Sequence, residues 1–305
     1  MIKQPLLSRL ERSITTAFLS GQMTRGVWIN GCQQPQSITR MDISAPMLMF
    51  PVIGLKRVVA DRQSYDARPG QVLMLPTGAR CDIENIPERG QSRFLGASLV
   101  FDRQTTELFN KIYSDGLKDW DLTPKWKAAG SEELYSLVAD WITHDQSYPA
   151  DLTQTRHRLV EVLLILARQG LAGNLLIARG DTLSARITQH FQTDLSRDWS
   201  VKDLTRVLAM SERTLRRRLQ AENTGFRELL EDTRLNRGVE RVISSDMPIG
   251  QIAFDCGYQS QSRFAERFRL RFSMSPTELR ATQGRTMGGG RWGGGRWGGG
   301  RWASW

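Results

Sequence analysis

A helix-turn-helix pattern occurs twice in the C-terminal third of the chain, and this repetition constrains the fold more than any other feature. In each copy, residues 201–222 and 247–272, apolar side chains recur four residues apart on both sides of a short turn. This spacing forms the stripe by which two short helices bury each other. The pattern predicts two helix-turn-helix units joined by a helix from about Gly225 to Ser245, with Gly257 as a left-handed stop in the second unit. The stripe residues are Leu204, Leu208, Leu215 and Leu219 in the first copy and Ile249, Ile252, Ala253, Phe264 and Phe268 in the second.

The positive charge of the chain is concentrated in the same third. Residues 183–285 contain 18 Lys and Arg against 13 Asp and Glu, a net charge of +5, and residues 286–305 add three arginines and no acid. Residues 1–182 therefore carry only +2 of the total of +10. Nearly all of the excess is arginine, which pairs bidentately with phosphate and with the guanine edge. Sign and residue type together favour nucleic acid as the partner.

Length and composition indicate a globular protein of two domains. The chain has 305 residues, of which 40% are hydrophobic and 24% charged. The N-terminus does not have the pattern of a signal peptide, and the apolar runs are too short to cross a bilayer, so we expect a cytoplasmic protein without a membrane segment. Cys32, Cys81 and Cys256 are an odd number without close spacing, which favours reduced thiols and a core position for Cys256.

Residues 24–101 have the pattern of an antiparallel β-barrel or sandwich. From about Thr105 the apolar period changes, and residues 105–172 are predicted to form helices. The last helix is apolar nearly all round between Leu159 and Leu166, so it must be buried. It could close the open end of the barrel or pair with its copy in a dimer. The predicted strands are RGVWI (25–29), MLMFPVI (47–53), LKRVVADRQSY (55–65), QVLML (71–75) and RFLGASLVF (93–101).

The domain boundary is predicted at a flexible joint close to Gly180, between a first domain at 1–180 and a second at 183–283. The tail at 286–305 repeats the pentad GGGRW and is too rich in glycine to hold a helix or strand, so we expect disorder. Its arginines and tryptophans could add nonspecific affinity for nucleic acid. It could instead be a readthrough, a repeat expansion or a cloning remnant, and the regularity of the repeat favours this second interpretation.

About 100 residues across both units match, in order, a set of positions typical of one protein family. The matching residues are Leu204, Ala209, Met210, Ser211, Leu215, Arg217, Leu219, Phe226, Arg234, Leu235, Ile249, Ile252, Ala253, Gly257, Tyr258, Ser262, Phe264, Phe268, Phe272, Ser275, Pro276 and Arg280. In these positions the chain resembles transcription regulators of the AraC/XylS family.

The β-rich segment resembles the cupin-like N-terminal barrel of a subset of that family. The residues that carry this weaker resemblance are Gly54, Lys56, Arg57, Val58, Tyr65, Pro69, Gly70, Gln71, Val72, Leu73 and Pro76. There are also departures from the family pattern. Gly238 stands where the family usually has alanine, which costs about 1 kcal/mol of helix stability. Leu219 replaces a common phenylalanine, and the repeat tail has no counterpart.

The resemblance implies a sequence-specific regulator of transcription that binds double-stranded DNA. Both recognition helices would enter successive major grooves, because the connecting helix fixes them side by side. The N-terminal domain would sense a small-molecule effector, form a homodimer, or do both. RNA polymerase would be a further partner if the protein activates transcription.

The candidate contact residues lie on the two predicted recognition helices, 212–221 and 261–271. Arginine suits guanine and glutamine suits adenine, whereas we expect Glu266 to hold a neighbouring arginine in place. The serine before each helix is expected both to cap the helix and to contact a phosphate. The candidates are Ser211, Arg213, Arg216, Arg217, Arg218, Ser260, Gln261, Ser262, Arg263, Glu266 and Arg267.

The N-terminal domain offers no catalytic pattern, so we expect no enzyme activity, no cofactor and no metal. Residues 1–143 contain no histidine, and His144, His157 and His190 are scattered. Candidates for an effector site are Trp28, Lys56 and Arg57, with Met47 and Met49, although core packing is the alternative for the tryptophan and the methionines. Two other functions stay open: a nonspecific nucleic-acid-binding protein that depends on the tail, and a barrel enzyme with an accessory DNA-binding domain.

Overall fold

The computed structural model describes residues 4–20, 24–90, 93–148, 151–177 and 182–282. The chain divides into two compact units, with the boundary at Gly180–Asp181. The flexible joint expected near Gly180 and the repeat tail at 286–305 lie outside the described residues.

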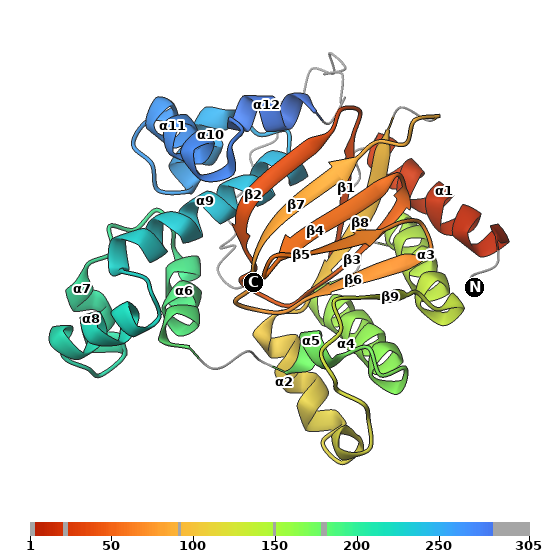
Figure 1. The fold of residues 1–305 in the computed structure, drawn as a ribbon, viewed down its shortest axis with the longest axis horizontal. Helices are drawn as coiled ribbons and strands as arrows, with labels where there is room; N and C mark the ends of the chain where they lie inside the picture. The colour runs from red at the N-terminus through yellow and green to blue at the C-terminus, as the bar shows by residue number, and fades with distance from the viewer. Residues whose placement is uncertain (1–3, 21–23, 91–92, 149–150, 178–181, 283–305) are drawn as a thin grey trace. The chain divides into compact units, whose positions relative to one another are not determined.

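The first unit contains two antiparallel sheets. The five-stranded sheet has the order β1 (Val27–Cys32), β8 (Phe94–Val100), β3 (Met47–Ile53), β6 (Gln71–Leu75) and β9 (Lys127–Ala129), and the four-stranded sheet has the order β2 (Gln36–Asp42), β7 (Arg80–Ile86), β4 (Leu55–Ala60) and β5 (Gln63–Ala67). Figure 1 shows one sheet behind the other. The expected antiparallel β architecture is confirmed, but the strands form two separate sheets and do not close into one barrel.

Segment 55–65, which the sequence predicts as one strand, is a hairpin of β4 and β5. Asp61 and Arg62 form its turn with φ of 50° and 65°, the left-handed conformation that matches the twist of paired strands. Strands β2 and β7 are absent from the sequence prediction. The alternation in β7 is masked by charged residues, and β2 is irregular between Ile38 and Met41. The prediction was wrong at these two strands because neither forms a continuous apolar run, and it also missed β9, which lies in the segment 105–172 expected to be helical.

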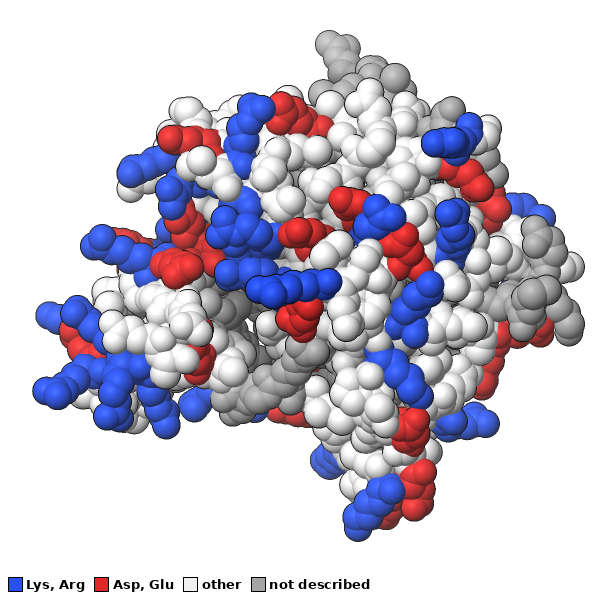
Figure 2. Space-filling view, in the orientation of Figure 1, with Lys and Arg blue, Asp and Glu red and all other residues white. Residues whose placement is uncertain are grey.

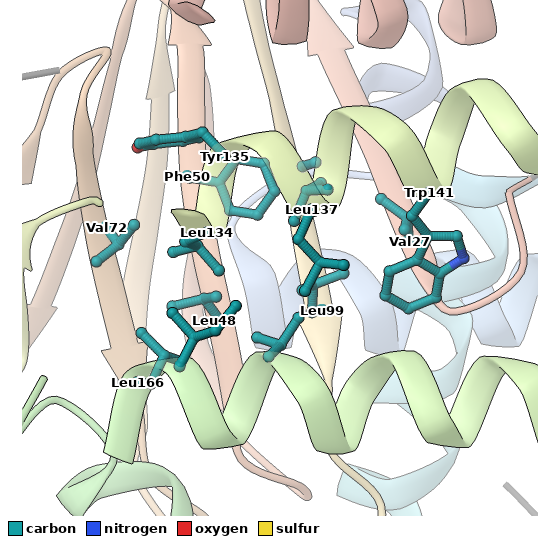
Figure 3. Packing of buried hydrophobic residues seen from close by; sticks show 14 of the residues in the cluster. Val27, Leu48, Phe50, Val72, Leu99, Leu134, Tyr135, Leu137, Trp141 and Leu166 are labelled. Atoms are coloured by element: carbon teal, nitrogen blue, oxygen red, sulfur yellow. The ribbon is translucent and has the colours of Figure 1, made fainter. Parts of the chain in front are cut away.

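Helices cover the outer face of the five-stranded sheet. They are α1 (Gln4–Ser20), α2 (Arg103–Ile112), the short 3₁₀ helix η1 (Gly116–Lys118), α3 (Glu132–Ser147), α4 (Leu152–Arg168) and α5 (Gly173–Leu176). Figure 3 shows α3 and α4 over the sheet, with Tyr135 and Trp141 of α3 and Leu166 of α4 among side chains such as Phe50 and Leu99. The apolar surface of α4 is therefore buried within this chain, against its own sheet and α3.

The second unit is all helical. Its helices are α6 (Leu183–Thr193), α7 (Val201–Val207), α8 (Glu212–Ala221), α9 (Phe226–Ser244), α10 (Ile249–Asp255), α11 (Gln261–Phe272) and α12 (Pro276–Ala281). The two predicted helix-turn-helix units are α7–α8 and α10–α11, and α9 is the predicted connecting helix. Within the described ranges, every helix lacks the length or the hydropathy needed to span a membrane.

Candidate functional site

The recognition helix of the first helix-turn-helix, α8, is positioned by its cap and its two leucines. The Ser211 hydroxyl accepts a hydrogen bond from the Thr214 backbone N–H at 3.2 Å, which satisfies one of the free donors at the start of the helix. Leu215 and Leu219 are buried in a cluster with residues of α6 and α7. The cap and the leucines together fix which side of α8 faces outward.

The outward side of α8 is a cluster of exposed arginines. At 100° per residue, Arg213 and Arg217 lie opposite the leucines, while Arg216 and Arg218 flank them. All four are exposed. In the described part of the chain the one carboxylate within ion-pair distance is Glu212, 3.8 Å from Arg216. Figure 2 shows the resulting blue patch at the left edge, where Figure 1 places α8.

Gln220 shares this outward side and is missing from the sequence prediction. It is exposed and lies three residues beyond Arg217, so it belongs to the same helical face. An amide at that place can read adenine. The helical spacing of Gln220 from Arg213 and Arg217 could have identified this residue in the sequence.

The recognition helix of the second helix-turn-helix, α11, is held by aromatic packing. Phe264 and Phe268 are fully buried with ring centroids 5.4 Å apart, and Tyr258 packs against Phe264 at 5.3 Å. The Ser260 hydroxyl accepts from the Arg263 N–H at 3.3 Å. The turn before the helix passes through Gly257, with φ of 80°. The stop and cap expected at these positions are both present.

The candidate contact residues of α11 do not all lie on one face. Ser262, Arg263 and Glu266 are exposed opposite the phenylalanines. Gln261 lies against α10, since a Cβ on Gly250 would be 3.0 Å from its Oε1 atom.

Arg267 turns toward α9, where its guanidinium donates two hydrogen bonds to the Glu231 carboxylate, which raises the arginine's pKa. Glu231 accounts for most of this shift, and the charge of Glu266 adds a smaller contribution. Among the described residues Glu266 forms no ion pair, and the carboxylate that holds Arg267 comes from the connecting helix.

Leu270 is the residue of α11 that the sequence prediction omitted. Its side chain is 65% exposed, and it lies one turn beyond Glu266 on the outward face. An exposed leucine there offers an apolar contact of the kind that recognises the thymine methyl group. Leu270 follows the buried Phe268 by two residues, and this spacing places its side chain on the outward face.

The connecting helix α9 makes specific contacts with other parts of the C-terminal domain. Arg234 donates hydrogen bonds from Nε to the Leu195 carbonyl and from Nη2 to the Arg197 carbonyl, both at 3.0 Å. At its centre, a Cβ on Gly238 would lie 2.8 Å from the Phe264 ring. The Phe264 ring of α11 therefore occupies the space that a side chain at Gly238 of α9 would need.

A buried lysine stands between the two sheets of the first unit. Lys56 is 2% exposed, and its Nζ donates to Asn85 Oδ1 at 2.7 Å, while Asn85 Nδ2 donates to Gln36 Oε1 at 2.6 Å. These three residues are register partners on β4, β7 and β2, so they form a row across the four-stranded sheet. The Lys56 ammonium also lies 5.3 Å from the centre of the Phe94 ring on the other sheet.

This lysine has no acidic partner in the part of the chain that the structure describes. Burial lowers the pKa of Lys56 to about 8 from an ordinary value of 10.5. The nearby Cys32 thiol gives no counter-charge at neutral pH, because burial raises its pKa to about 12. Asn85 and Gln36 were not predicted. The signal for Asn85 was available, since it occupies the inward phase of the alternating segment 80–86.

The other two effector candidates lie elsewhere. Arg57 points to the opposite face of β4, where Asp66 binds it with two hydrogen bonds of 2.8 Å and Glu84 lies at 3.4 Å. Trp28 is 36% exposed on β1, so core packing does not describe it. The three cysteines are buried and free, and Cys256 is a core residue as expected. The described residues contain no group of three or more His, Cys, Asp or Glu side chains that could hold a metal ion.

Two helix-turn-helix units on one connecting helix, each with an exposed polar face on its second helix, define a double helix-turn-helix DNA-binding domain. Residues 204–282 match the family model described as a helix-turn-helix domain. The resemblance to AraC-type regulators seen in the sequence is confirmed for this helix-turn-helix domain.

Relatives and solved structures extend this comparison. The HTH-type transcriptional activator FapR from Escherichia coli is 36% identical over 95 residues, which cover 31% of this chain and 36% of FapR. The match to the HTH-type regulator GadX of Escherichia coli O157:H7 covers 38% of GadX at 29% identity. The chain thus spans little more than a third of these curated relatives.

A solved structure of apo ToxT from Vibrio cholerae is similar over 84% of this chain and 97% of that protein, with a TM-score of 0.63 and 15% identity. ToxT has also been solved with a bound unsaturated fatty acid, and that structure matches with a TM-score of 0.58. At this identity the likeness establishes the fold: an N-terminal β domain followed by a helical domain.

Proposed function

We propose that this chain is a sequence-specific DNA-binding transcriptional regulator that acts in the cytoplasm and catalyses no reaction. The observation that carries the proposal is the outward face of α8, where Arg213 and Arg217 lie one turn apart opposite two buried leucines. Arginine donates paired hydrogen bonds to O6 and N7 of guanine in the major groove. Two relatives are named a transcriptional activator and a transcriptional regulator, which supports a role in transcription.

Selection of bound fragments from random duplex DNA tests this function. The purified full-length chain should enrich fragments that share a motif with two parts. The centres of these parts should be about one helical turn, or roughly 34 Å, apart, because two recognition helices on one connecting helix enter successive grooves. Enrichment of fragments without any common motif would contradict the proposal.

The tail-dependent alternative makes a different prediction. A nonspecific nucleic-acid-binding protein that depends on the GGGRW repeats would lose most of its affinity when residues 286–305 are deleted, whatever the DNA sequence. The regulator should keep its motif and nearly all of its specific affinity after the same deletion. A barrel enzyme would require a metal or catalytic group in the first unit, so elemental analysis of the purified protein should detect no stoichiometric metal.

The second part of the proposal is that the N-terminal domain binds a small apolar effector through a carboxylate. Lys56 supports this choice, because a buried ammonium that lacks an acidic partner would gain more from an anion than an exposed one. Its surroundings include apolar side chains such as Phe94 and Val58. The fatty acid bound to ToxT is a carboxylate of this kind.

Calorimetric titration with oleate, below its micelle concentration, tests the effector proposal. The full-length chain should bind oleate, and Lys56→Met should weaken binding at least about tenfold, as expected for a buried charge pair. Arg57→Met is the matched control, because it removes a positive charge one residue away on the opposite face of β4. Equal affinities of the wild type and Lys56→Met would contradict the role of the lysine.

Two further partners belong to the same proposal. RNA polymerase is the expected partner if the chain activates transcription, and a second copy of the chain is expected if the operator contains two half-sites. Sedimentation of the chain with and without the selected DNA would measure the number of copies that bind.

A further inference from the structure

The two recognition helices differ in how their arginines are partnered. On α11, three of the four arginines lie beside carboxylates of the same domain: Arg267 beside Glu231, Arg269 beside Glu278 at 3.3 Å, and Arg271 beside Asp232 at 3.1 Å. On α8, four arginines face one carboxylate, Glu212, at the long distance of 3.8 Å from Arg216. Both helices carry four arginines, but α11 keeps little free positive charge.

The contrast is clearest at one equivalent position. Arg218 precedes the buried Leu219 on α8, and Arg267 precedes the buried Phe268 on α11, so both flank the inward face of their helix at the same angle. Arg218 has no acidic partner among the described residues and is free to bind a phosphate. Arg267 is bound through Nε and Nη2 by the Glu231 carboxylate. A phosphate could recruit Arg267 only by displacing that carboxylate.

Free arginines and bound arginines contribute differently to DNA affinity. Each phosphate contact made by a free cation releases counterions and steepens the salt dependence of binding by roughly 0.9 in log–log slope, whatever the DNA sequence. An arginine already neutralised by a carboxylate adds little of this attraction. Base-facing side chains, by contrast, contribute only where the sequence fits. On α11 the outward residues Ser262, Arg263, Glu266 and Leu270 are of this second kind.

We propose that Glu231 is a specificity-determining residue, which keeps Arg267 off the DNA backbone so that α11 adds affinity only at a matching sequence. Salt-dependent, sequence-independent attraction then comes mainly from the flanking Arg216 and Arg218 of α8, while the base-facing residues of both helices supply the discrimination. This inference rests on the proposed DNA-binding function and adds a division of labour between the two units. Glu231 lies on the connecting helix and was not among the candidate contact residues.

The test is the salt dependence of binding of the full-length chain to two duplexes, a selected fragment and an unrelated one of equal length. Glu231→Gln should raise affinity for the unrelated duplex roughly fivefold near physiological salt and steepen its slope by about one, because Arg267 gains a phosphate. The ratio of specific to nonspecific affinity should fall by a similar factor. Glu228→Gln is the matched control, since it removes from the same helix one exposed carboxylate that forms no ion pair with the described residues.

Two more variants keep the test independent of any change in folding. Arg267→Gln should leave the slope of the wild type unchanged, whereas Arg218→Gln should reduce it by about one. The double variant Glu231→Gln with Arg267→Gln should return the slope to that of the wild type.

Two outcomes would overturn the inference. One is that Glu231→Gln and Glu228→Gln behave alike. The other is that Glu231→Gln weakens binding only to the selected fragment, because Glu231 would then support an Arg267 that reads a base. These failures are distinct from failure of the proposed function, in which the wild type itself would not distinguish the two duplexes.

Discussion

At the scale of single residues, the turns before the two recognition helices require the same left-handed backbone but tolerate different side chains. Ala209 has φ of 50° and Gly257 has φ of 80°. A Cβ on Gly257 would lie 2.3 Å from the Leu195 carbonyl oxygen and 2.7 Å from Arg234 Nε. Glycine is therefore required in the second turn for close packing as well as for conformation.

Substitutions in the two turns should have opposite effects on stability. Gly257→Ala should destabilise the C-terminal domain by at least about 2 kcal/mol, because it adds a steric clash to an unfavourable conformation. Ala209→Gly should stabilise it or leave it unchanged, within about 1 kcal/mol, because the strain of a positive φ is relieved. Hydrogen exchange of the α10 and α11 amides in the full-length chain measures both effects. A neutral Gly257→Ala would refute the packing argument.

Lys56 makes the stability of the N-terminal domain depend on pH. Its pKa is about 8 in the folded chain and 10.5 when unfolded, so between these pH values the unfolded chain binds more protons. Stability should therefore rise with pH across this window. Below about pH 8 the full cost of burying the charge is present, and a shift of this size corresponds to about 3 kcal/mol.

The variant Lys56→Met should remove this cost. We expect it to stabilise the domain at pH 7 by about 2 kcal/mol, after allowance for the hydrogen bond that Asn85 loses. The rise in stability between pH 8 and 10.5 should disappear as well. Hydrogen exchange of the β4 and β7 amides at several pH values follows the domain within the full-length chain. The same rise in both proteins would show that another group titrates.

At the scale of elements, the helices of the second unit follow from local spacing and the strands of the first do not. Leucine and phenylalanine pairs four residues apart locate α8 and α11 within a residue or two, because a helix buries residues that are near in sequence. In β7 the inward row is Cys81, Ile83 and Asn85, separated by charged residues. This row can be recognised as buried only when a second sheet is known to cover it, so the sequence alone did not identify the strand.

The contact between α9 and α11 at Gly238 leaves no room for a side chain. Alanine at Gly238 would gain about 1 kcal/mol of helix propensity. Its Cβ would press on the Phe264 ring, and overpacking of a core typically costs about 1–3 kcal/mol. We therefore expect Gly238→Ala to destabilise the domain, and Phe264→Leu in the same chain to reverse part of the loss. A double-mutant cycle by thermal unfolding measures this coupling, and additive effects would contradict it.

At the scale of the whole molecule, the sequence predicts the order of the domains and the helices that would meet DNA, but not the interactions between distant residues. The pairing of Arg267 with Glu231 joins positions 36 residues apart, and the row of Gln36, Lys56 and Asn85 depends on the register of three strands. Periodicity specifies which face of an element is outward. It does not specify the partner that each side chain finds there.

We expect α8 and α11 each to read a separate part of one DNA site. The most direct measurement of this is fragment selection with Arg217→Ala and with Arg263→Ala, compared with the wild type. Each variant should lose about 1–3 kcal/mol of specific affinity and relax base preference in one part of the motif only, with the two parts about one helical turn apart. If both variants kept the wild-type motif, or if both relaxed the same positions, the two helices would not read separate parts of the site.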